Sequence, residues 1–436
     1  MKKNYLLYFI LFYSFSFSQY YKPIDTMQSA YISNLSGKFE MEKKGFLDEI
    51  EKKKLTNREK KELTKIYTDF YDNELKDIQK GYFFSLPSLN EYIGKIVDEI
   101  TRKNPDIDKK NLKILLSRED APNAYTGING NIKVNYSFLK YMLSEDDLAA
   151  ILCHEIGHYY LKHPENAIEE HVKTRFSKEV KEEESRIRGL EFNKSSAAEQ
   201  LLKKIVYNRK KINREEEIKA DSIGLLFLKK TSYNQSAMIG LLEKLNKIDI
   251  EKDSLTKEDF KKYFSIPNHK FDDSWLELED ISAYQFKKDH YFKWEIDSLK
   301  THPSCEERIK FLKPQLDGIA VTNFNINQNY FQEIIIQAEF EEVRSLYFIK
   351  EYGLSMYRAL LLYKKYPEND FALKMIAANL EKFKDAKTKK NYGKYILPIN
   401  PFEQSHSQQL FYTFFDNIGT AEINAFEEYY KNKIKK

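Results

Sequence analysis

Residues 144–160, SEDDLAAILCHEIGHYY, have the features of a helix with a defined start. Ser144 is a favourable N-cap, and Asp147 follows three residues later. Pro164 predicts that the helix ends at about His163, because proline lacks the amide hydrogen that a helix interior needs. Between these limits apolar residues recur at helical spacing: Leu148, Ile151, Leu152 and Ile156. We therefore expect a well-capped, largely buried helix.

His154, Glu155 and His158 in this helix fit the pattern H-E-x-x-H. Two residues four positions apart lie on one helix face, so both imidazoles can bind a single zinc ion. Glu155 lies one position round the helix, where it can remove a proton from a zinc-bound water as general base. A chance match on a structural helix is the alternative. It is disfavoured because three polar side chains on an apolar, buried helix need partners.

A second predicted helix, around residues 215–221 (EEEIKAD), carries a candidate third ligand. Glu217 and Asp221 are also four positions apart and share a face. One carboxylate can bind zinc, and the other can accept a hydrogen bond from the far ring nitrogen of a liganding histidine. The run of three glutamates would normally face solvent, but Glu217 is in register with Asp221 and the apolar face. Two histidines and Glu217 leave a fourth position for water, so we expect one zinc ion per chain.

Two short strands are predicted upstream of the first helix. Residues 112–116 form an apolar run, and a Gly/Asn turn at residues 127–130 precedes the second strand. That strand, residues 131–136, alternates between apolar and polar side chains, which is typical of a strand with one buried face. Its apolar face carries Ile132, Val134 and Tyr136, and its polar face carries Lys133 and Asn135.

The first eighteen residues have the pattern of an export signal. Lys2 and Lys3 form a positive start, an apolar stretch covers residues 5–17, and Ser16 and Ser18 are small residues where a signal peptidase cleaves. We expect a mature protein in the periplasm, or a secreted one; an uncleaved anchor is the alternative. No later stretch is long and apolar enough for a membrane helix, so any association with the cell envelope would be peripheral.

The overall charge argues against nucleic acid as a partner. Lys and Arg number 71 and Asp and Glu 67, and a net charge of +4 provides no basic surface for a phosphate backbone. The two cysteines, Cys153 and Cys305, are too few for a small fold held together by disulfides. Whether these two residues pair is left open by the sequence.

Four stretches, in order, resemble one gluzincin family of zinc metallopeptidases, which includes the CAAX prenyl proteases, HtpX and the BepA-type proteases. They are residues 123–125 with the strand 131–136, residues 148–158, residues 214–224, and Thr301-His302-Pro303 followed by Glu307-Arg308-Ile309. The resemblance covers about residues 85–315. It implies an α+β, mainly helical, zincin-type domain with a small sheet. The membrane helices of the prenyl proteases and HtpX are absent, so the soluble, exported branch is the closer match.

The resemblance also implies roles outside the ligand set. His302 would lie near the metal, where it would stabilise the oxyanion or occupy the fourth coordination site of a latent form; a polar loop residue is the alternative. His163 and His171 are interpreted as structural or surface residues, because His163 should point elsewhere on the helix than His158. An extended substrate would add as a strand beside residues 131–136. The expected substrate-binding strand is Asn131, Ile132, Lys133, Val134 and Asn135.

These patterns predict a zinc-dependent metalloendopeptidase that cleaves protein substrates, with a possible role in quality control in the cell envelope. The alternative is a latent or vestigial protease that acts as a binding module for envelope proteins. The C-terminal region reads as short amphipathic helices, and a single helix-hairpin pattern suggests a tetratricopeptide-like module. The expected organisation is a signal peptide (1–18), a helical segment (19–84), the metallopeptidase domain (85–315) with a charged helical insertion or lid (165–215), and a helical C-terminal domain (316–436).

Overall fold

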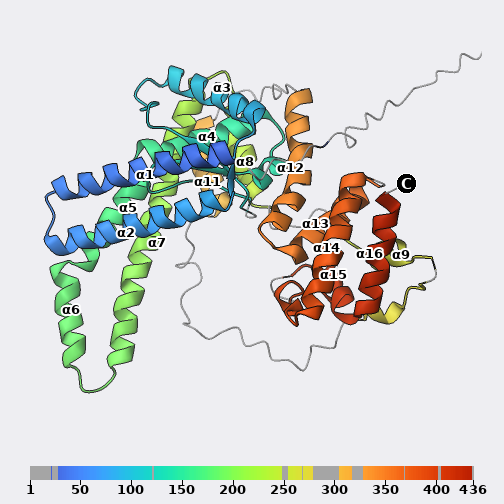
Figure 1. The fold of residues 1–436 in the computed structure, drawn as a ribbon. Helices are drawn as coiled ribbons and strands as arrows, with labels where there is room; N and C mark the ends of the chain where they lie inside the picture. The colour runs from blue at the N-terminus through green and yellow to red at the C-terminus, as the bar shows by residue number, and fades with distance from the viewer. Residues whose placement is uncertain are drawn as a thin grey trace, which may run out of the picture.

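The computed structural model is mainly helical, with one small sheet and an all-helical C-terminal region (Figure 1), which confirms the predicted fold class. The expected signal peptide and His302 lie outside the described residues. None of the described helices combines the length and the apolar character needed to cross a bilayer. The structure describes residues 21, 28–119, 122–247, 254–267, 269–277, 304–316, 328–367, 369–400 and 404–434.

The first two described helices, α1 (Ser29–Lys52) and α2 (Asn57–Gln79), form a helical hairpin. Thr56 caps α2 in a capping box with Glu59, which fixes where the second helix starts. The facing sides of the two helices are apolar and form a core cluster. Its buried members include Leu35, Phe39, Leu63, Tyr67, Tyr71 and Ile78.

The sheet has four short strands in the order β1-β2-β4-β3, which places β3 at one edge and β4 inside. β4 pairs with β2 in parallel and with β3 in antiparallel orientation. The prediction that substrate adds beside residues 131–136 is therefore wrong, because both sides of that strand already have partners. The strands are β1 (Phe83–Phe84), β2 (Ile114–Ser117), β3 (Ala124–Thr126) and β4 (Ile132–Asn135).

The sheet is a middle layer, covered on both faces. Leu116 and Val134 pack against the core that contains α3 (Pro87–Lys103), whereas Leu115 packs against the α1–α2 hairpin. The predicted solvent face of β4 is accordingly buried, and Lys133 is only 2% exposed. Its ammonium group is 2.5 Å from Glu74 of α2, which neutralises it. The sequence of the strand alone could not show that a distant hairpin supplies this partner.

The central helix α4 (Glu145–Tyr160) begins as predicted. The Ser144 side chain accepts from the Asp147 amide, and the Asp147 side chain accepts from the Ser144 amide. It follows the short 3-10 helix η2 (Tyr136–Tyr141) and is buried on nearly every side from Asp146 to Gly157. The helix ends at Tyr160, a few residues before the predicted position.

The charged segment after α4 folds into α5 (His163–Arg175), α6 (Lys178–Gly189) and the first half of α7 (Lys194–Lys229). The helix α6 and this half of α7 form a hairpin that projects from the body (Figure 1). Phe192 lies in the connecting loop and is 79% exposed. That loop is about 36 Å along α7 from Glu217, at 1.5 Å per residue. The outer part of this segment is therefore not a lid over Glu217.

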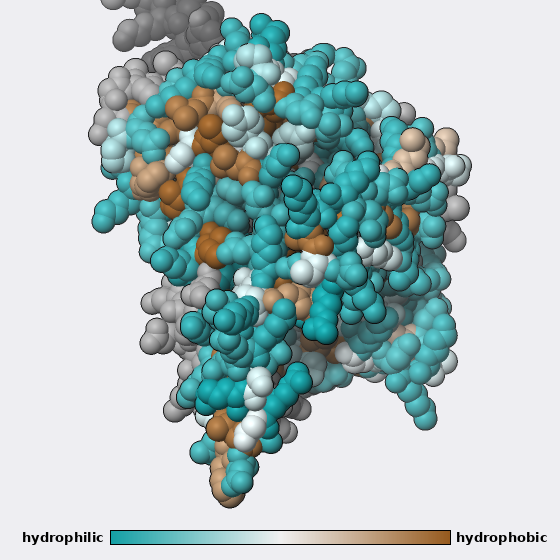
Figure 2. Space-filling view, turned by 90° about the vertical axis from the view of Figure 1, so that its left-hand side faces the viewer, coloured by the Kyte–Doolittle hydropathy of each residue, from teal (hydrophilic) through white to brown (hydrophobic). Residues whose placement is uncertain are grey.

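Short helices complete the region around the main core and lead into the C-terminal region. α8 and α11 pack on the main core, and both cysteines in the chain are free. In the view of Figure 2 the surface is mainly hydrophilic, with small apolar patches. The elements are α8 (Ala237–Leu245), α9 (Lys257–Phe264), η3 (Asp273–Leu276), α11 (Cys305–Leu312) and η5 (Lys313–Leu316).

The helix α12 (Gln328–Phe348) belongs to two cores at once. Its first half contributes Phe331 and Ile334 to the core around α4, and its second half contributes Phe340 and Val343 to the C-terminal core. The tetratricopeptide-like interpretation of the C-terminal helices stays a prediction. These helices are α13 (Tyr352–Lys365), α14 (Asp370–Thr388), the 3-10 helix η6 (Tyr392–Lys394), α15 (His406–Asn417) and α16 (Thr420–Ile434).

Candidate metal centre

Two glycines allow α4 and α7 to cross closely. A Cβ atom on Gly157 would lie 2.9 Å from the main-chain oxygen of Ala220, and one on Gly224 would lie 2.9 Å from that of Cys153. No larger residue fits at either position without a shift of the helices, since real Cβ contacts are essentially never this short. The close crossing brings the middle of α7 against the histidines of α4.

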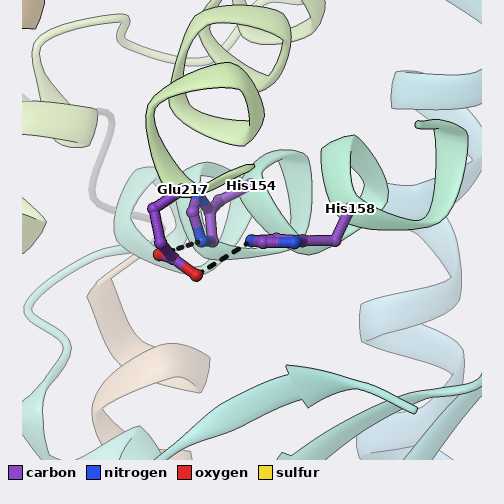
Figure 3. A group of neighbouring side chains, drawn as sticks. All are labelled: His154, His158 and Glu217. Carbon is purple, nitrogen blue, oxygen red and sulfur yellow. Dashed lines mark ion pairs between the residues drawn. The ribbon is translucent and has the colours of Figure 1, made fainter. Parts of the chain in front are cut away.

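Three side chains converge at this crossing: His154 and His158 from α4 and Glu217 from α7 (Figure 3). His154 Nε2 is 3.6 Å from Glu217 Oε2, and His158 Nε2 is 3.4 Å from Glu217 Oε1. Four ligands at zinc bond lengths in a tetrahedron are separated by about 3.3 Å, so these spacings suit a common zinc ion. The donors are two imidazole nitrogens and a carboxylate, the set found in catalytic zinc sites with one open position.

The three consecutive glutamates have different surroundings. Glu215 is exposed and pairs with Lys211, whereas Glu216 pairs with Arg209 at 3.4 Å. Only Glu217 faces the two histidines. The helical register with Asp221, used in the sequence analysis, therefore selected the glutamate that the structure places in the group.

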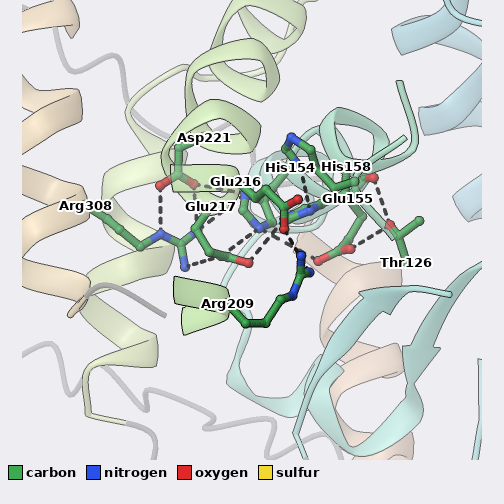
Figure 4. Close-up of polar contacts among 10 residues, drawn as sticks. Thr126, His154, Glu155, His158, Arg209, Glu216, Glu217, Asp221 and Arg308 are labelled. Atoms are coloured by element: carbon green, nitrogen blue, oxygen red, sulfur yellow. Dashed lines mark hydrogen bonds and ion pairs between the residues drawn. The ribbon is translucent and has the colours of Figure 1, made fainter. Parts of the chain in front are cut away.

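Behind His154 lies a buried ion pair. His154 Nδ1 is 2.9 Å from Asp221 Oδ1, and Arg308 donates two bonds to the same carboxylate, at 2.7 Å from Nε and 2.6 Å from Nη2 (Figure 4). Burial raises the pKa of Asp221, but the bonds from Arg308 and His154 outweigh it, and the net pKa is lowered. Asp221 thus stays ionised and can accept the Nδ1 proton, leaving Nε2 of His154 free to bind a metal. Arg308 also lies 3.4 Å from Glu217.

His163 occupies the corresponding place behind His158. Its Nδ1 is 3.0 Å from Nδ1 of His158, so the interpretation that it points elsewhere is wrong. The reason is the backbone: Lys162 is left-handed, with φ of 53°, and turns the chain so that His163 begins a new helix beside the old one. Burial is the largest of the causes that lower the pKa of His163 to about 4.

Glu155, beside the ligand group, is only 4% exposed. Its Oε2 is 2.8 Å from the hydroxyl of Thr126, which comes from the edge strand β3 (Figure 4). The same hydroxyl is 2.9 Å from the main-chain oxygen of Glu155. The other carboxylate oxygen of Glu155, Oε1, is 4.0 Å from His154 Nε2 and so faces the ligand group. This arrangement suits a base that acts on a water bound at the same centre.

The outer side of β3 pairs with no other strand among the described residues. The Gly127 amide donates to the Asn131 oxygen, which shows that the main chain at Gly127 faces β4. Facing alternates along an antiparallel pair, so Tyr125 also faces β4, and the amide and carbonyl groups of Ala124 and Thr126 point outward. These groups form an unpaired edge next to Glu155.

The sequence profile of peptidase family M48 matches residues 87–315, just over half of the chain. The chain belongs to peptidase family M48. This family is one of zinc-dependent metallopeptidases, which confirms the resemblance to the gluzincins. Comparison with curated protein sequences found no match.

Three residues of this M48 site were not given a role by the sequence analysis. Thr126 contacts Glu155, His163 contacts His158, and Arg308 contacts Asp221, which in turn holds His154. In each of the first three pairs the two residues come from different helices or strands. The motif Glu307-Arg308-Ile309 was a signal for Arg308, although not for its partner. The role predicted for His302 stays a prediction.

Proposed function

We propose that this protein is a zinc-dependent metalloendopeptidase that cleaves protein substrates in the cell envelope. The observation that carries the proposal is the buried group His154–His158–Glu217 with Glu155 beside it. Membership of M48 supports a peptidase. The presence of all four side chains supports an active enzyme over a vestigial one, because a binding module would have no need of Glu155.

A zinc ion held by His154, His158 and Glu217 would polarise the scissile carbonyl and lower the pKa of a bound water. Glu155 would take the proton from that water and pass it to the leaving amine. Thr126 donates to Oε2 of Glu155, which leaves Oε1 directed toward the ligand group. Asp221 and Arg308 hold His154 from behind.

An extended polypeptide would bind along the outer edge of β3, antiparallel or parallel to it, rather than along β4. The outward amide and carbonyl groups of Ala124 and Thr126 would bond to its main chain. Main-chain recognition tolerates many side chains, which supports a broad specificity. Ala124→Pro would remove one outward amide and should raise KM, whereas a change confined to an inward-facing group would not.

The proposed location is the periplasm, with secretion as the alternative. It rests on the pattern of residues 1–18, with its two lysines, apolar stretch and small residues. Fractionation of cells that produce the full chain, with N-terminal sequencing of the mature form, tests this. A mature protein that starts at Gln19 in the periplasmic fraction is expected; a chain that keeps residues 1–18 in the cytoplasm would refute it.

The function is tested by zinc content and casein cleavage of the purified protein and of Glu155→Gln. We expect about one zinc per chain in both proteins, and cleavage only by the wild type. Zinc in both without cleavage would favour the latent or binding form, and His302→Ala would then be compared. Absence of zinc after purification with excess metal would refute the metal site itself.

A further inference from the structure

We propose that His163 is the positioning residue for His158: its Nδ1 accepts the Nδ1 proton of His158 and holds that ring with Nε2 directed at the metal. This inference rests on the proposed zinc site. It assigns a function to a side chain outside the H-E-x-x-H pattern and outside the three ligands.

The two rings meet through their Nδ1 atoms. These atoms are 3.0 Å apart, and the rings lie edge to face, with centroids 4.9 Å apart and planes at 76°. Two ring nitrogens at this distance share one proton, so one ring donates and the other accepts. The bond therefore couples the tautomer of His158 to that of His163.

Binding of a metal at Nε2 of His158 would fix which of the two rings donates the shared proton. Nε2 of His158 lies among the converging ligand atoms, 3.4 Å from Glu217 Oε1, and a ligand nitrogen must offer its lone pair. The proton of neutral His158 is then on Nδ1, and His163 must accept it with its own Nδ1. His163 carries its remaining proton on Nε2.

The backbone holds His163 where this bond needs it. The left-handed Lys162 ends the path of α4, and Pro164 in the first turn of α5 fixes the start of the next helix. His163 is 6% exposed, so few other positions are open to its ring. Among the described residues, the converging ligand atoms come from His154, His158 and Glu217, whereas Nδ1 of His163 lies against the far ring nitrogen of His158.

A neutral acceptor suits this side of the site. Glu155, Glu217 and Asp221 already place three carboxylates around the histidines, and Arg308 is the cation that contacts two of them. A further carboxylate behind His158 would add negative charge to a buried region, at a desolvation cost. An imidazole provides the acceptor without the charge.

The test compares two substitutions of similar size. His163→Asn keeps an acceptor near the position of Nδ1, whereas His163→Leu keeps the bulk and removes the acceptor. His171→Leu, on the exposed side of the same helix, is the control. Zinc affinity is measured by competition with a chromophoric chelator at neutral pH, and circular dichroism of each metal-free protein reports the fold. His163→Ala replaces the leucine variant if that variant does not fold.

We expect the leucine variant to bind zinc about 10- to 100-fold more weakly than wild type, as for other partners of liganding histidines. The asparagine variant should stay within about threefold of wild type, and so should the control. Wild-type affinity in the leucine variant would overturn the proposal, and so would an equal loss in the asparagine and leucine variants, since packing would then explain it. If the wild type itself binds no zinc, the proposed function fails instead.

Discussion

Replacing Arg308 with methionine should destabilise the metal-free protein by about 3–5 kcal/mol, the usual cost of removing one partner of a buried ion pair. The Asp221 side chain is completely buried and that of Arg308 is 10% exposed, so water cannot replace the lost bonds. Arg308 also faces Glu217 at 3.4 Å, so its loss removes a cation from beside both carboxylates. The lost contacts are those that join α7 to α11.

The measurement is urea unfolding in excess chelator, followed by circular dichroism. Arg186→Met is the matched control, because Arg186 makes the same two-bond contact with Glu183, at 2.8 and 2.6 Å, on the exposed surface of α6. It should leave stability essentially unchanged, because an ion pair exposed to solvent contributes little. Arg308→Met with Asp221→Asn removes both charges and should be less destabilised than the single variant. A loss below about 1 kcal/mol for Arg308→Met would refute the reasoning.

Three further outcomes follow from single contacts. Thr126→Val should lower kcat on the order of tenfold with little change in zinc content, because the charged Glu155 carboxylate loses a hydrogen bond. Thr126→Ser keeps the hydroxyl and should keep kcat near that of the wild type. Equal rates in all three proteins would contradict this. Gly157→Ala should weaken zinc binding in a chelator competition, because its Cβ would meet the main chain of α7 at 2.9 Å. Unchanged affinity would show that α4 and α7 can move apart without disturbing the ligands. Burial raises the pKa of Asp259, but bonds from Lys364 and the α9 cap outweigh it, so its net pKa is lowered. Its contribution to stability is present above its unfolded pKa of about 3.9 and is lost as the pH falls through the lower folded value. Asp259→Asn should flatten the acid limb of stability against pH, and an identical acid limb would contradict the assignment.

Local spacing was sufficient to predict which site side chains share a helix face. His154 and His158 are one turn apart, and the register with Asp221 selected Glu217, so no knowledge of the tertiary structure was needed. The capping box at Ser144 is local in the same way.

The contacts that escaped prediction join separate elements. Arg308 is 87 positions from Asp221, and no period in the sequence relates them. His163 is near in sequence, but its position depends on the left-handed backbone of Lys162, a conformation that lysine seldom adopts. The free edge of the sheet could not be located because strand order, and not strand pattern, decides that β3 lies outside β4.

The sharing of α12 between two cores has a consequence for how the protein melts. Phe331 and Ile334 complete the core around α4, while Phe340 and Val343, about two to three turns along the helix, complete the C-terminal core. Neither core can lose this helix and keep its apolar surface covered, and the buried pair of Arg118 with Glu341 ties the helix to the end of β2. The two regions should therefore unfold in one cooperative transition. A chain shortened at the end of the M48 match would not be a smaller enzyme but an unfinished one, with the site intact in sequence and its support removed.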